Sequence, residues 1–138
     1  MATFNKVPAF VEALAEKVHN LGADVLKIML TNAVPGSYAV KADLTEISAG
    51  NGYTAGGTAA TISSSSQTGG TYKLVLADVV FTASGGTIGP FRYAWLYNDT
   101  ASNDELIGYW DYGSSITLQA GETFTVDCDP SAGVLTIA

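Results

Sequence analysis

The chain has 138 residues and a formal net charge of −7, with 47% hydrophobic residues and only 14% charged ones. Residues 1–73 balance five lysines against five acids, whereas residues 74–138 hold one arginine against eight acids, an excess that disfavours nucleic acid as a partner because phosphate contacts require Lys and Arg. The single cysteine excludes an internal disulfide, and no apolar run approaches the ~18 residues of a membrane-spanning helix.

The length suits one domain over residues 1–138, with an N-terminal helix in residues 1–22. Apolar residues recur there every three or four positions: Phe4, Val7, Val11, Leu14, Val18 and Leu21. Pro8 suits a first helical turn, and Gly22 predicts a left-handed helix end. The stripe fits a helix packed on its own domain, and also the a and d positions of a short coiled coil. Phe10 and Leu14 are candidate interface residues on this helix.

Residues 23–138 predict a mainly β body, an antiparallel β-sandwich or jelly roll. Residues 24–30 alternate apolar Leu26, Ile28 and Leu30 with a mixed second face. A turn centred on Pro35 and Gly36 follows. Residues 48–70 are almost all Gly, Ser, Thr and Ala, which predicts a loop followed by a Thr/Ser strand near 58–68, or a disordered linker.

The remaining strands are predicted between short turns. Residues 71–83 form one candidate run, and residues 84–90 separate it from an aromatic strand at 91–98. The turn at 98–104 leads to a strand at 105–112, and further short strands follow at 116–118, 123–129 and 134–138. The chain ends inside the last of these, so we expect its C-terminus to be held in a sheet.

The aromatic hairpin raises the question of what its rings contact. Every second residue of the strand at 91–97 is aromatic, and the next strand adds three more rings: Phe91, Tyr93, Trp95 and Tyr97, then Tyr109, Trp110 and Tyr112. The first strand is expected to face mainly the core. Because one face of a hairpin cannot bury seven rings, we expect part of the set to contact another subunit. The candidate interface residues here are Tyr97, Tyr109, Trp110 and Tyr112.

Residues that typically carry catalysis are scarce. His19 is the only histidine, and a solvated or helix-capping role is expected for it. Cys128 alternates with Phe124 and Val126 and is predicted to be a small buried hydrophobe. The neighbouring acids Asp127 and Asp129 are interpreted as turn formers, although their spacing superficially matches the start of a Ca²⁺ loop. We therefore expect no catalytic residues, no cofactor and no metal.

Four stretches together resemble a known group of proteins. They read FVEALAEKVHNLGADVLKIMLTN, LTEISAGNGYTAGGTAA, GGTYKLVLADVVFTASGGTIGPFRYAWLYNDT and LIGYWDYGSSITLQAGETFTVD, and they cover most of the chain. These sequences are similar to those of small virion structural proteins of tailed bacteriophages, of the capsid decoration or cement type. The resemblance implies a non-enzymatic protein with a β-sandwich or jelly-roll body. It does not distinguish head from neck or tail.

The function expected from this resemblance is stabilisation of a virus head. The partners would be the major capsid protein and copies of the chain itself, as a dimer or trimer, without nucleic acid or membrane. The protein would be made in the host bacterial cytoplasm and located on the capsid surface. The low charge fits a surface covered by other subunits, and equally a β protein covered by Thr, Ser and Gly. The alternative is a carbohydrate- or receptor-binding fibre or tail domain, in which Trp95, Tyr97, Tyr109 or Trp110 stacks on a sugar.

Overall fold

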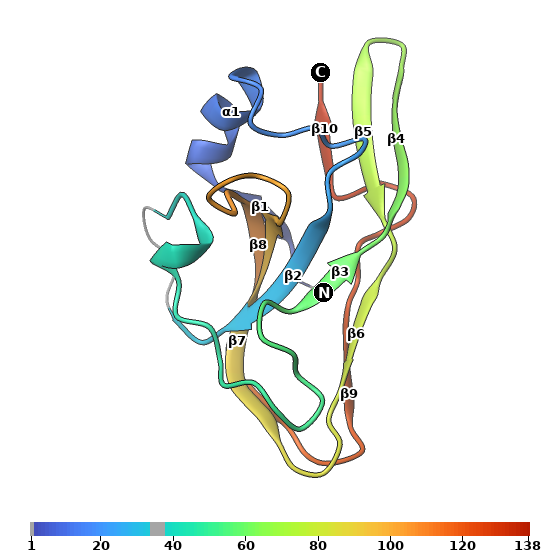
Figure 1. Ribbon diagram of the computed structural model, residues 1–138. Helices are drawn as coiled ribbons and strands as arrows, with labels where there is room; N and C mark the ends of the chain where they lie inside the picture. The colour runs from blue at the N-terminus through green and yellow to red at the C-terminus, as the bar shows by residue number, and fades with distance from the viewer. Residues whose placement is uncertain (1, 34–37) are drawn as a thin grey trace.

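The computed structural model describes residues 2–33 and 38–138, and it is mainly β with one short α-helix (Figure 1). The predicted turn at Pro35 and Gly36 lies outside the described residues. The elements in chain order are β1 (Phe4–Lys6), α1 (Pro8–Ala15), β2 (Leu26–Thr31), the 3₁₀ turn η1 (Lys41–Asp43), β3 (Thr58–Ala60), β4 (Ile62–Thr68), β5 (Thr71–Leu76), β6 (Val79–Thr82), β7 (Ile88–Asn98), β8 (Leu106–Leu118), β9 (Thr123–Val126) and β10 (Leu135–Ile137).

The strands form three antiparallel sheets, an arrangement that is consistent with the predicted antiparallel β-sandwich. The largest has the order β1-β8-β7-β2-β3, and β7 and β8 at its centre are the aromatic hairpin. A three-stranded sheet, β10-β5-β4, and a two-stranded sheet, β6-β9, lie together on one side of it (Figure 1). The jelly-roll alternative stays a prediction. The candidate run at 71–83 is two strands, because β5 and β6 belong to different sheets.

The predicted N-terminal helix is much shorter than residues 1–22. Helix α1 ends at Ala15, and Lys17, with φ of 69°, adopts the left-handed conformation predicted for Gly22. Backbone N–H groups of Lys17 and Val18 donate to Leu14 and Ala13 carbonyls, at 3.3 and 2.9 Å, which is a Schellman end. The apolar residues before and after the helix continue its spacing because β1 and the loop after α1 also pack on the core.

Gly108 explains why residues 4–6 form a strand. Phe4 pairs opposite Trp110 at the sheet edge, and the two ring centroids lie 4.9 Å apart in an edge-to-face arrangement. A Cβ on Gly108 would collide with the ring of Phe4 and with the carbonyl of Asn5. The glycine therefore lets β1 lie close to β8, so Phe4 is part of a sheet and not of a helix.

The four aromatic residues of β7 do not share one set of neighbours. Tyr93 and Trp95 contact Tyr109, with centroids 6.3 and 4.7 Å apart, whereas Phe91 contacts Phe124 of β9 at 4.9 Å. The pairing of β7 with β8 shifts register between Phe91 and Tyr93, which breaks the simple alternation of faces. Both faces of β7 are nevertheless buried, because each is covered by other elements.

Residues 38–57 cover the face of the large sheet that carries Trp95 and Tyr97. The ring of Tyr38 meets that of Trp95 edge-on at 5.5 Å, and the Lys41 ammonium lies 5.1 Å from the centre of the Tyr97 ring. The Tyr53 hydroxyl accepts the N–H of Leu30 at 3.0 Å, which protects the edge of β2 beyond its pairing with β3. Residues 48–57, predicted as a loop or a disordered linker, are thus part of a structured cover, and the predicted Thr/Ser strand follows them as β3 and β4.

The other buried residues form one continuous core between the layers. Cys128 is 2% exposed, as predicted from its alternation with Phe124 and Val126. Burial raises the pKa of its thiol to about 12. No helix within the described residues is long and apolar enough to cross a membrane.

Candidate functional site

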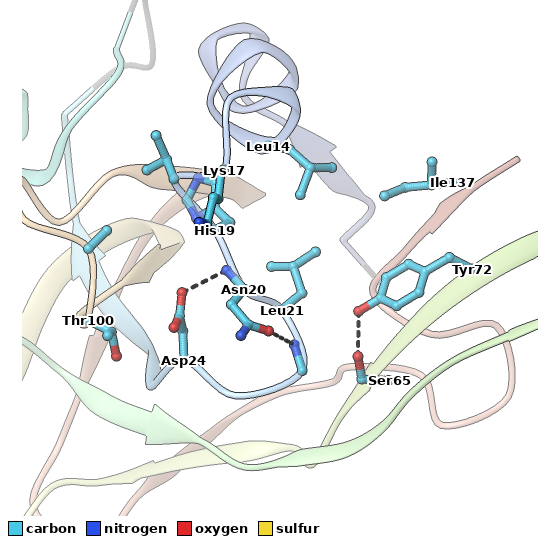
Figure 2. A pocket seen from close by; sticks show the side chains of 13 residues that line it. Leu14, Lys17, His19, Asn20, Leu21, Asp24, Ser65, Tyr72, Thr100 and Ile137 are labelled. Atoms are coloured by element: carbon cyan, nitrogen blue, oxygen red, sulfur yellow. Dashed lines mark hydrogen bonds between the residues drawn. The ribbon is translucent and has the colours of Figure 1, made fainter.

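A large cleft lies between α1, the loop that follows it, and the three-stranded sheet (Figure 2). Its volume is about 690 Å³, within the range of small-molecule sites. Its lining comes from four separate parts of the chain: Leu14, Lys17, Val18, His19, Asn20, Leu21, Gly22, Asp24, Ser65, Tyr72, Thr100, Ala101 and Ile137. The left-handed turn at Lys17 directs the loop away from the helix axis and so opens the cleft.

Asn98, at the end of β7, holds the polar side of the cleft together. Its side chain is fully buried, and its amide nitrogen donates to Asp24 Oδ2 at 2.6 Å and to His19 Nδ1 at 3.0 Å. Its amide oxygen accepts the N–H groups of Thr100 and Ala101 at 2.9 and 3.2 Å. One side chain therefore joins the loop after α1 to the turn between β7 and β8.

His19 is buried, which corrects the expected solvated or helix-capping role. It is 7% exposed, and its ring packs 5.1 Å from that of Phe10. Burial lowers the pKa of the imidazole, although Glu105 and Asp24 oppose this effect. Because Nδ1 accepts from Asn98, the neutral ring carries its proton on Nε2, and that atom is buried without a partner among the described residues.

The opposite wall of the cleft is mainly apolar. Leu14 from α1 and Leu21 from the loop face Tyr72 and Ile137 across the opening (Figure 2). The Tyr72 hydroxyl lies 2.7 Å from Ser65 Oγ, which fixes the tilt of the ring. Since Ser65 is bonded to Tyr72 and His19 Nδ1 to Asn98, this arrangement is better suited to binding than to nucleophilic chemistry.

Three of the predicted interface residues are buried inside the chain, and their prediction as contact residues is wrong. Tyr97 is 0% exposed, Phe10 is 1% and Trp110 is 3%. The Tyr97 hydroxyl donates to the carbonyl of Gly56 at 2.6 Å, so residues 38–57 bury the ring. The prediction assumed that only one face of the aromatic hairpin is buried, whereas other elements cover both faces of β7.

Tyr109, Tyr112 and Leu14 are half-buried, and only part of each side chain is open to a partner. Tyr109 packs on Trp95, and Tyr112 meets Phe124 edge-on at 4.7 Å. Burial raises the pKa of the Tyr112 hydroxyl. Three of the four rings suggested for sugar stacking, Trp95, Tyr97 and Trp110, are inaccessible.

The paired acids act as turn formers in the structure. Asp129 Oδ1 accepts the N–H groups of Ser131 and Ala132 at 2.9 and 3.0 Å, and Asp127 Oδ1 accepts the N–H of Asp129. These bonds lower the pKa of Asp129. Within residues 2–33 and 38–138, no three His, Cys, Asp or Glu side chains gather as metal ligands would.

Sequence reasoning missed the cleft and its organising residue. The sequence pattern places Asn98 where the aromatic strand meets a turn and Asp24 at the start of a strand, and it indicates no functional role for either. A signal was present, because Asn at the end of a strand before Asp-Thr often bonds the backbone two or three residues ahead. Its contacts with His19 and Asp24, 79 and 74 residues away, had no local signal. No known protein family, curated protein or solved structure matches the chain.

Proposed function

We propose that the chain is a virion structural protein of the capsid decoration type. It binds across neighbouring copies of the major capsid protein on the head surface, after synthesis in the host bacterial cytoplasm. The proposal starts from the resemblance read from the sequence, which is most specific over residues 49–57, 88–100 and 106–126.

The observation that carries the proposal is a long exposed surface without charge. The 26 residues 47–72 contain no Asp, Glu, Lys, Arg or His, and most residues of β3 and β4 are nevertheless exposed. Free proteins usually keep such surfaces dispersed with mixed charges. Depletion of charge is instead a feature of surfaces that other subunits cover.

The mechanism is passive. Each copy adds contact area between capsid subunits, and many identical weak contacts combine to resist the pressure of packaged DNA. This role needs a rigid body and no catalytic group. The acidic second half of the chain also disfavours contact with DNA, which suits a position on the outer surface.

Electron cryomicroscopy of virions tests the proposal. We expect density matching this fold at repeated positions on the head, and its loss in virions made without the gene. Heads lacking the protein should also release DNA at a lower temperature. Absence of the protein from purified virions, or density confined to the tail, would contradict the assignment.

A second candidate function, glycan binding, is favoured by one feature of the cleft. The half-buried Tyr72 ring lines the same cleft as polar Asn20 and Asp24, a combination of aromatic and planar polar groups that suits a sugar. A glycan array with the wild-type protein tests it. Tyr72→Ala should abolish any signal, whereas Tyr72→Phe should retain it because the ring remains. No signal above background would remove this candidate.

A further inference from the structure

Strand β4 is an open edge of the three-stranded sheet. The order β10-β5-β4 leaves one side of β4 unpaired, and no backbone hydrogen bond from another described element reaches that side. At seven residues, Ile62–Thr68 is the longest of the described strands that stand at the end of a sheet order, since the other five have three or four residues. An open edge of this length is a template for pairing with another chain.

The usual protections of an edge strand are mostly missing here. Proteins block free edges with Lys, Pro, inward charges or bulges. The sequence ISSSSQT has no charge and no proline, and its one irregularity is the register shift between Ile62 and Ser64. By comparison, β1 carries Lys6, and β9 is flanked by Glu122 and Asp127.

The hairpin geometry determines which backbone groups face outward. Gly69 and Gly70, with φ of 60° and 87°, form a two-residue turn, so Thr68 and Thr71 are a hydrogen-bonded pair. Because hydrogen-bonded and non-bonded pairs alternate, Ser65 lies opposite Leu74 in a non-bonded pair. The N–H and C=O of Ser65 therefore point away from β5, toward the open side.

We propose that β4 pairs antiparallel with β4 of a second copy, about a two-fold axis through Ser65. Ser65, the midpoint of Ile62–Thr68, then exchanges N–H···O bonds with Ser65 of the second copy. Ser64 lies opposite Ser66 of that copy. These two hydroxyls are already 3.3 Å apart within one strand, and pairing gathers four of them on one face.

Charge and symmetry identify a second copy as the occupant. An antiparallel pair of identical strands places like residues near one another, which is unfavourable for charged strands and neutral for this one. Residues 47–72, which include β4 and the segments next to it, contain no charged side chain, so the two-fold axis brings no like charges together there either. The pairing adds to the proposed function one specific contact between two copies of the chain. Any role of this contact on a capsid rests on the proposed function, whereas the dimer can be detected with the purified protein alone.

Disulfide cross-linking tests the register. In a hydrogen-bonded antiparallel pair the two Cα atoms lie ~5.5 Å apart, close enough for a disulfide. Ser65→Cys should therefore give a covalent dimer under mild oxidation, and the buried Cys128 should not interfere. Thr123→Cys on exposed β9 is the control and should stay monomeric. Equal cross-linking of the two variants, or none with Ser65→Cys, would overturn the proposed axis.

Sedimentation of the unlinked protein tests the backbone bonds. Ser65→Ala and Ser65→Pro both remove the hydroxyl that contacts Tyr72, but only proline removes the outward N–H. Wild type and Ser65→Ala should dimerise with similar affinity, whereas the dimer of Ser65→Pro should be weaker by a factor of about ten or more. A monomeric wild type, or three equal dimers, would refute the pairing. Dimers that fail to bind capsids would refute only the capsid role.

Discussion

Replacing Asn98 by Asp should destabilise the protein in a pH-dependent way. The change is nearly isosteric, and it keeps the oxygen that accepts the N–H groups of Thr100 and Ala101. It replaces the amide that donates to Asp24 Oδ2 at 2.6 Å with a carboxylate oxygen. A hydrogen bond to a charged group is thereby exchanged for a repulsion between two carboxylates.

The magnitude follows from the bond that is lost. A hydrogen bond to a charged group contributes about 1.5–3 kcal/mol, and the repulsion adds to this, so we expect a loss of about 3 kcal/mol at pH 7. The repulsion raises the pKa of the introduced carboxyl above its unfolded value, so the folded variant binds a proton more tightly. The deficit relative to wild type should therefore be complete at pH 7 and shrink as the pH falls through the raised pKa.

Urea denaturation at pH 7 and at pH 5 measures both effects. Asn103→Asp is the matched control, because it adds the same charge at an exposed position of the same turn and should change stability by less than about 0.5 kcal/mol. If Asn98→Asp unfolds like wild type at pH 7, or if its deficit is independent of pH, the assigned role of Asn98 is wrong.

Three further predictions concern His19, Gly57 and Cys128. Burial lowers the folded pKa of His19 below its ordinary 6.5, so wild-type stability should fall as the pH drops below about 6.5, and His19→Asn should flatten this slope in melts between pH 7 and 5. Gly57 and Gly70 both have positive φ, but a Cβ on Gly57 would also collide with the Ile28 carbonyl. Gly70→Ala should therefore cost about 1–2 kcal/mol and Gly57→Ala clearly more, and equal costs would contradict the close approach. Cys128 should react with thiol reagents only after denaturant is added, and Cys128→Ser should cost about 1–3 kcal/mol, whereas fast native labelling would show that its strand is misplaced.

Much of the fold could be predicted from local patterns. The alternation of Phe124, Val126 and Cys128 placed the thiol inside, and the strand near 58–68 and the run at 71–83 were predicted on either side of the glycines that form the turn between β4 and β5. These features depend on neighbours within a few residues, because strand alternation and tight turns are properties of the local backbone. The mainly β class with one short helix followed from the same signals.

Helix length and aromatic burial depended on contacts that no local pattern contains. The stripe from Phe4 to Leu21 had helical spacing throughout, yet Phe4 lies in a strand because Gly108, about a hundred residues later, leaves room for its ring. Tyr97 has the residue type and position of a contact residue. It is buried because Gly56, 41 residues earlier, accepts its hydroxyl.

The sequence by itself determined the mainly β class, the positions of most strands and turns, the burial of Cys128 and the uncharged stretch that includes β4. The tertiary structure alone decided where α1 ends, which rings are covered, and how Asn98 brings His19 and Asp24 to one cleft. The physical reason is that periodicity reports which side chains avoid water. Which distant segment covers them depends on the packing of the whole chain.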